Sequence, residues 1–162
     1  MDKIVKQSAR ALLFNSEQRL VLMKRTKPGQ EPYWVSVGGG LEPEDDSIEA
    51  ALHREVFEEL SGRIDGVRQV LLITDDLPRV IGLQHIFVAR LVSMDPSRRT
   101  GPEFTDPDHG TYEVVTVPAT REALADIHLL PPRLAEFAQA NIHGLLALLH
   151  QDDAVLEQDK TR

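Results

Sequence analysis

The chain contains no cysteine, which excludes disulfide bonds and thiolate chemistry. This lack is compatible with a reducing compartment, and we expect a cytoplasmic protein. Tryptophan is scarce as well, since Trp34 is the only one among 162 residues. It lies in a short apolar run and is expected in the core, although a base-stacking surface residue is the alternative.

Long hydrophobic runs and an excess of basic charge are also missing. No segment approaches the roughly 18 apolar residues that a membrane-spanning helix needs, and the N-terminal MDKIVKQSAR lacks the apolar core of a signal peptide. The 18 Lys and Arg residues are outnumbered by 26 Asp and Glu, giving a formal net charge of -8. Since nucleic-acid binding requires a basic surface, we expect neither a nucleic-acid nor a membrane partner.

The composition, with 41% hydrophobic and 27% charged residues, is typical of a globular domain. A chain of this length can bury a substantial core within one domain. We expect that domain to span residues 1–150 and a polar tail to follow over residues 151–162. Hydrophobic patterning predicts strands over residues 4–14, 20–23, 33–37, 67–74, 83–92 and 112–117, and helices over residues 118–125 and about 131–149.

The most informative stretch is GGGLEPEDDSIEAALHREVFEELSGRI, from Gly38 to Ile64. Asp46 is a candidate N-cap, and Glu49 three residues later would complete a capping box. An apolar residue then recurs at every fourth position, which predicts an amphipathic helix. The residues of this apolar stripe are Ile48, Leu52, Val56 and Leu60.

Three carboxylates share one face of the predicted helix, because Glu55, Glu58 and Glu59 lie at i, i+3 and i+4. Like charges at this spacing destabilise a helix by about 0.2–0.5 kcal/mol per pair. A divalent cation would reverse the sign of that term, and clustered oxygen ligands with partial access to water suit Mg²⁺. A solvated acidic face without a ligand explains the same spacing, so the three residues alone leave both interpretations open.

The run from Arg54 to Glu59, REVFEE, together with the upstream glycines, resembles the Nudix box, G-x5-E-x7-R-E-U-x-E-E-x-G-U, in which U is a bulky aliphatic residue. The resemblance implies the Nudix fold, an α/β architecture in which a mixed β-sheet is sandwiched between helices. It also implies a divalent cation, Mg²⁺ or Mn²⁺. The reaction it implies is hydrolysis of a small-molecule nucleoside diphosphate linked to another moiety.

The same likeness assigns roles to individual residues. Glu55, Glu58 and Glu59 would bind the metal or hold its water, and Arg54 would pair with a helix carboxylate and orient it. Gly39 and Gly40 belong to a glycine loop that would turn tightly and let the backbone approach metal and phosphates, because glycine tolerates positive φ.

Two positions depart from the box. Counting back from the arginine places the first acid of the box on Asp46, whereas counting forward from the glycines places it on Asp45, so the loop carries one extra residue. Ser61 stands where the box has glycine, and Gly62 comes one place late. These departures leave the role of either aspartate open and do not affect the three glutamates.

Two further site residues are predicted outside the box. Arg25 lies in a basic cluster before a Pro/Gly loop and is a candidate phosphate contact, because arginine can bind phosphate oxygens bidentately. The irregular segment from Met94 to Gly110 is long for a compact domain. It supplies Glu103 as the candidate for the extra carboxylate that many Nudix enzymes recruit. A solvated strand end and a plain surface loop are the respective alternatives, and His85 is expected to be a hydrogen-bonded sheet residue and not a catalytic one.

Two other functions have to be weighed against hydrolysis. A Nudix-like sensor domain would bind a nucleotide without cleaving it, but such domains typically lose the paired glutamates that this chain keeps. Isoprenoid diphosphate isomerisation on the same fold would require a catalytic cysteine, which is absent. Many family members are homodimers, so the resemblance leaves a homodimer open.

Overall fold

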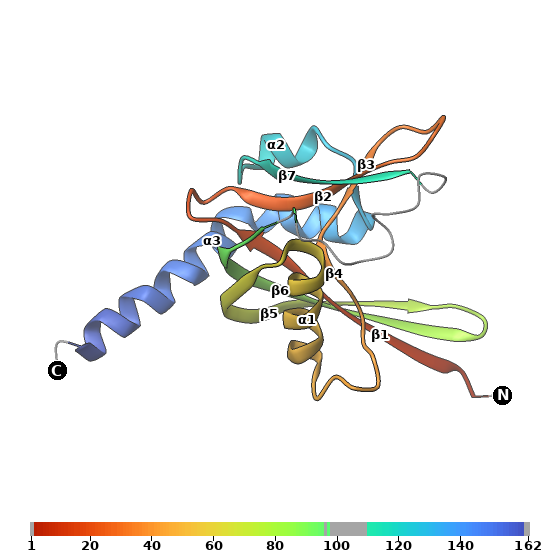
Figure 1. The fold of residues 1–162 in the computed structure, drawn as a ribbon, viewed down its shortest axis with the longest axis horizontal. Helices are drawn as coiled ribbons and strands as arrows, with labels where there is room; N and C mark the ends of the chain where they lie inside the picture. Colours follow the sequence, from red (N-terminus) through yellow and green to blue (C-terminus); the bar gives the residue numbers. More distant parts are fainter. Residues whose placement is uncertain (1, 96, 98–109, 161–162) are drawn as a thin grey trace.

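The structure is a computed structural model that describes residues 2–95, 97 and 110–160, with side chains described as far as residue 150. Its helices and strands follow one another along the chain as shown in Figure 1. In order they are β1 (Ile4–Phe14), β2 (Leu20–Thr26), β3 (Tyr33–Val35), β4 (Val37–Gly40), α1 (Ile48–Leu60), β5 (Arg63–Asp76), β6 (Val80–Ser93), β7 (Thr111–Val117), α2 (Arg121–Ala125), β8 (Leu129–Leu130) and α3 (Pro132–Lys160).

The strands form one mixed sheet in the order β5-β6-β1-β2-β3-β8, to which β4 is added on β1 and β7 on β2. Strand β1 is central to this sheet because it pairs in parallel with β6 along its whole length. On its other edge β1 changes partner, from β4 at Ser8–Ala11 to β2 at Leu13 and Phe14. This change of partner places the glycines of β4 beside the middle of β1.

Helices α1 and α3 cover opposite faces of the sheet, because alternate residues of β1 point to opposite faces. Ala9, Ala11 and Leu13 pack with the buried residues of α1, whereas Leu12 and Phe14 pack with those of α3. The expected mixed sheet between helices is therefore confirmed. Among the described residues, no helix is both long and apolar enough to cross a membrane.

Several boundaries differ from those expected. The strand predicted over residues 33–37 is split at Ser36, which separates β3 from β4. The strands predicted over residues 67–74 and 83–92 are longer, because together they form the long hairpin of β5 and β6. Helix α3 continues through Lys160, although a polar tail was expected from residue 151, because residues 145–160 contain neither proline nor glycine to end it.

One prediction about a single residue is confirmed and another holds only in part. Trp34 is half-buried: it packs against the cluster on the α3 face, and the ammonium of Lys24 lies 5.4 Å from the centre of its ring. His85 is bonded on both sides within the sheet: its Nε2 lies 2.8 Å from the side-chain oxygen of Gln7, and its Nδ1 lies 2.9 Å from the amide nitrogen of Gln69.

Candidate active site

Helix α1 begins one residue later than its sequence indicated. Ser47, not Asp46, is the N-cap: its hydroxyl accepts a hydrogen bond from the backbone N–H of Ala50 at 3.0 Å. The preceding turn is closed by two bonds, from the Asp45 N–H to the Glu42 carbonyl at 3.0 Å and from the Glu42 N–H to the Asp45 carboxylate at 2.8 Å. This closed turn ends at Asp45 and leaves Asp46 outside it, and Asp45 is the aspartate that pairs with Arg54.

Arg54 is the centre of the site, since all five of its N–H donors have acceptors. Nε and Nη2 each donate to the Asp45 carboxylate at 2.9 Å, and Nη2 also donates to the Gly40 carbonyl at 2.9 Å. Nη1 donates to Glu55 and to Glu58, at 3.1 Å each. Arg54 was expected to orient one helix carboxylate, and it contacts two, together with the loop acid and the backbone of β4.

Hydrogen bonding and burial shift the pKa values of two of these carboxylates in opposite directions. The Asp45 side chain is only 6% exposed, and its hydrogen bonds from Arg54 lower its pKa. The Glu55 side chain is 14% exposed, and desolvation raises its pKa even though Arg54 acts in the opposite direction. Burial thus disfavours the ionised form of Glu55, while Arg54 favours it.

The remaining two glutamates of the box lie beside this pair. Nη1 of Arg54 lies 3.1 Å from an oxygen of Glu55 and 3.1 Å from an oxygen of Glu58. This one nitrogen therefore holds the two carboxylates close together. Glu59 points to β4, where it accepts a bond from the backbone N–H of Gly38 at 3.3 Å. Among the described side chains, no three acidic or histidine groups are already arranged around a common point as metal ligands.

The glycines form the strand β4 and not the tight loop that was expected. Gly38, Gly39 and Gly40 pair antiparallel with Ser8–Arg10 of β1. A Cβ at Gly39 would lie 2.6 Å from the carboxyl carbon of Glu55, so the absence of a side chain there is what lets that carboxylate approach the strand. Gly38 has φ +146°, and a Cβ there would meet the Ala9 carbonyl oxygen at 2.2 Å.

Helix α1 ends at the position where the box usually has glycine. Ser61 adopts the left-handed conformation, φ 46° and ψ 45°, and its N–H donates to the Phe57 carbonyl at 2.8 Å. Left-handed caps of this kind are usually made by glycine. Serine therefore performs the capping function of the missing glycine, at a conformational cost.

The two site residues predicted outside the box have different outcomes. Arg25 lies on β2, with its guanidinium 4.2 Å from the centre of the Tyr112 ring. Its role as a phosphate contact stays a prediction. Glu103 lies outside the described residues, and its role stays a prediction too.

Sequence reasoning missed Arg10. From the middle of β1 this residue donates through Nη1 to the Ser36 carbonyl at 3.0 Å, and its charge favours the ionised form of Glu55. An isolated arginine within the apolar run of residues 9–14 was the available signal. What it contacts depends on the pairing of β1 with β4, which the sequence does not show.

The family model of the NUDIX domain matches residues 5–139, most of the chain. The chain belongs to the Nudix family. Membership of this family makes it a hydrolase, in general terms a pyrophosphohydrolase. No curated protein sequence matches the chain significantly.

Several solved structures share the fold. A NUDIX hydrolase from Nitrosomonas europaea has a TM-score of 0.60 and 19% identity, over 88% of this chain and 90% of that one. The E. coli ORF135 protein has a TM-score of 0.59 and 20% identity, over 86% and 91%. A MutT protein from Methanosarcina mazei Go1 has a TM-score of 0.57 and 16% identity, over 94% and 98%. At these identities the likeness supports the fold alone.

Proposed function

We propose that this Nudix protein is a divalent-metal-dependent pyrophosphohydrolase that cleaves a nucleoside diphosphate linked to another moiety. The observation that carries the proposal is the use of all five donors of Arg54 to hold Asp45, Glu55 and Glu58 against the glycine strand. A purely structural ion pair would need one carboxylate. Here one guanidinium holds two carboxylates of α1 and one of the preceding loop close together, which leaves several carboxylate oxygens near one point for a metal ion.

The residues fit a divalent cation. Glu55, Glu58 and Glu59 offer carboxylate oxygens, the ligands that Mg²⁺ and Mn²⁺ prefer. The Glu55 side chain is 14% exposed, and burial raises its pKa by disfavouring the charged form, which a bound cation would favour. When bound, the ion would neutralise phosphate charge and lower the pKa of an attacking water.

The protein itself would mainly position the diphosphate and the attacking water and neutralise the charge of the phosphates. One water adds across the diphosphate: a new oxygen–phosphorus bond forms, the bridging phosphorus–oxygen bond breaks, and two monophosphates leave while the protons of the water pass to products and solvent. Positioning and charge stabilisation dominate such reactions. With a net charge of -8, attraction of the anionic substrate depends on local cations, for which Arg10 and Arg25 are the candidates.

A non-hydrolytic nucleotide-binding domain is the alternative. The observation in its favour is that, among the described side chains, no three acidic or histidine groups are arranged around a common point as metal ligands. The retained pair Glu58 and Glu59 favours the enzyme. As further parts of the proposal, we take the enzyme to be a single domain over residues 1–150 that works in the cytoplasm, as a homodimer in the manner of many family members, with Glu103 as the additional carboxylate.

A panel of nucleoside diphosphate compounds assayed with Mg²⁺ and with Mn²⁺, with products separated by chromatography, tests the proposal. Glu58→Gln and Glu59→Gln should each lower kcat by about 100-fold or more, because each removes a charged ligand while keeping the shape of the side chain. Glu136→Gln, on the exposed face of α3, is the matched control and should retain full activity. Equal kcat values for all variants on a cleaved substrate would exclude the assignment.

A further inference from the structure

Strand β7 is a terminal strand of the sheet, since it pairs with β2 and with no other described strand. Its seven residues, Thr111–Val117, pair with Leu20–Thr26 of β2 without a register shift. In Figure 1 it lies beside β2, on the side away from β1. Five of the seven residues are β-branched and one is aromatic, and these residue types favour strands. A regular terminal strand of this kind is a template for pairing with another chain.

The other long terminal strand, β5, has features that oppose such pairing. Its register against β6 shifts at three places, and bulges of this kind twist an edge away from a partner strand. In addition, Nη1 of Arg133 on α3 donates to the Thr74 carbonyl of β5 at 2.9 Å. Strand β7 has no register shift against β2, and its sequence contains neither lysine nor proline. Of these two strands, β7 is therefore the one that a further strand can extend.

A second copy of the chain fits this edge, because β7 can pair with itself about a two-fold axis. With the axis at Val114, all seven residues pair: Val114 lies opposite its own counterpart, and Tyr112 lies opposite the partner subunit's Thr116. Aromatic and β-branched residues are favourable neighbours across strands. Glu113, which is the only charged residue of β7, then lies opposite the partner subunit's Val115. An axis at Glu113 would instead place two like charges directly opposite each other, which is destabilising.

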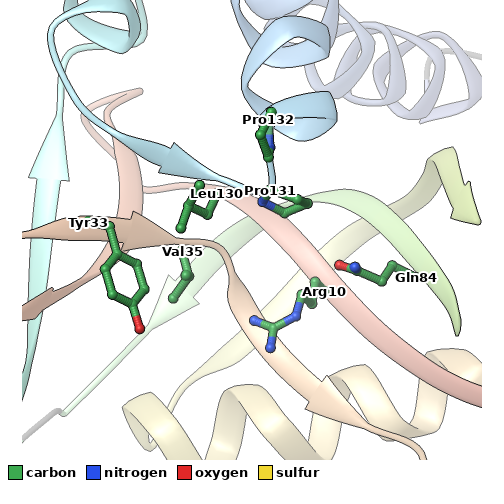
Figure 2. Close-up of a pocket in the computed structure, with 7 residues that line it drawn as sticks. All are labelled: Arg10, Tyr33, Val35, Gln84, Leu130, Pro131 and Pro132. Atoms are coloured by element: carbon green, nitrogen blue, oxygen red, sulfur yellow. The ribbon is translucent and has the colours of Figure 1, made fainter. Parts of the chain in front are cut away.

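Pairing at β7 leaves the opposite edge of β2 unchanged. Strand β3 lies on that edge, where Tyr33 is the register partner of Arg25. Figure 2 shows Tyr33 and Val35 of β3 beside Arg10, around a cavity of about 390 Å³. On the β7 side, Arg25 is the register partner of Tyr112, and its guanidinium lies 4.2 Å from the centre of that ring. The partner strand would therefore contact Tyr112 and leave the cavity beside β3 open.

We propose that two copies of this chain associate through their β7 strands, antiparallel and with the two-fold axis at Val114, so that their sheets join into one. The inference rests on the homodimer of the proposed function and names its interface. Main-chain hydrogen bonds provide the affinity, and the position of Glu113 selects the register. One seven-residue strand from each chain makes a contact at the small end of specific interfaces, so the dimer is weak and depends on protein concentration.

Single cysteines test the register of this interface, because the chain has no cysteine of its own. Residues directly opposite each other in an antiparallel pair have Cα atoms about 4.5–5.5 Å apart, a separation that a disulfide can bridge. Under mild oxidation, Val114→Cys should give a covalent dimer at a yield about 10-fold above that of Thr111→Cys, whose counterpart lies at the far end of the partner strand. Leu72→Cys, which is exposed on β5, is the control for random collisions. A yield from either control that equals or exceeds that of Val114→Cys would overturn the inference.

Sedimentation equilibrium of the wild-type chain tests the interface without a new cysteine. It should show a monomer–dimer equilibrium, and Thr116→Lys should weaken the dimer by about 10-fold or more, because lysine on a strand edge opposes pairing. Thr74→Lys is the matched control, since Thr74 is also an exposed threonine on a terminal strand, and it should leave the equilibrium unchanged. Melting of each variant shows that it is folded. A wild-type monomer at concentrations up to about 1 mM, or equal effects of the two lysines, would overturn the inference.

The interface and the proposed reaction fail separately. A monomeric chain that cleaves nucleoside diphosphate compounds would overturn the interface and keep the pyrophosphohydrolase. A dimer that is cross-linked at Val114→Cys but cleaves none of these compounds with Mg²⁺ or Mn²⁺ would overturn the pyrophosphohydrolase and keep the interface.

Discussion

Replacing Gly39 with alanine is the substitution that should separate catalysis from folding most sharply. The new Cβ would lie 2.6 Å from the carboxyl carbon and Oε1 of Glu55, and 2.8 Å from its Oε2. Non-bonded carbon and oxygen atoms keep about 3.5 Å apart, so the carboxylate has to retreat by roughly 1 Å. A displacement of that size in a catalytic constellation costs about 100-fold in rate.

The cost in stability should be smaller, because the clash is with the far end of a side chain and not with backbone. Overpacking of this kind costs about 1–3 kcal/mol, which thermal denaturation measures on the same sample. Gly144→Ala is the matched control: nothing lies within 4 Å of its added Cβ, in the middle of α3. It should keep full activity and raise stability by about 0.5–1 kcal/mol.

Gly38→Ala should instead disrupt the backbone. Its Cβ would meet the backbone oxygen of Ala9 at 2.2 Å, and its φ is +146°. That variant should lose folding and activity together. A folded Gly39→Ala enzyme with wild-type kcat and KM would refute this reasoning. It would mean that the position of the Glu55 carboxylate against β4 does not matter for the reaction.

Three further outcomes follow from the same contacts. Glu55→Gln should abolish activity yet raise Tm near pH 7, because desolvation raises the pKa of Glu55 and its charged form opposes folding; this advantage should shrink in melts at lower pH, as the wild-type carboxyl becomes protonated. Asp45→Asn should lower activity and stability at neutral pH, and its stability difference from wild type should close as the pH falls below 3.8, because Arg54 lowers the pKa of Asp45; denaturant titrations across pH measure this. Ser61→Gly should raise stability by about 1 kcal/mol, seen as a Tm increase of about 2–4 °C, because glycine adopts the left-handed conformation of this cap without a Cβ clash.

Helix α1 and the placement of its three glutamates were predictable because they depend on local patterns, whereas the fold as a whole was expected from the resemblance to the Nudix box. The four-residue spacing from Ile48 to Leu60 gives helix α1 one buried face, and the residues of that face are the ones that pack on β1. The i, i+3, i+4 spacing of the glutamates puts them on one turn whatever surrounds the helix. For helix α1, the spacing of residues along the chain is enough to predict its buried face and the placement of its glutamates.

The choice between Asp45 and Asp46 could not be made from the sequence. Asp46 and Ser47 are both residue types that favour the N-cap position. In the structure Ser47 caps the helix, while the turn from Glu42 to Asp45 and the hydrogen bond from Arg54 to Asp45 fix the loop before it. The contacts of Arg10 and the close approach of Gly39 to Glu55 depend on the pairing of β4 with β1, which joins segments about thirty residues apart. Such pairings follow from the whole sheet and not from any one stretch.

Metal binding at the box is the central claim, and a crystal of the protein soaked in Mn²⁺ tests it most directly through anomalous scattering. The account predicts a peak within coordination distance of carboxylate oxygens from Glu55, Glu58 and Glu59, with at least one of them rotated away from its bond to Arg54 or Gly38. Saturating Mn²⁺ with no peak at this turn, and all three carboxylates still held in their internal hydrogen bonds, would contradict it.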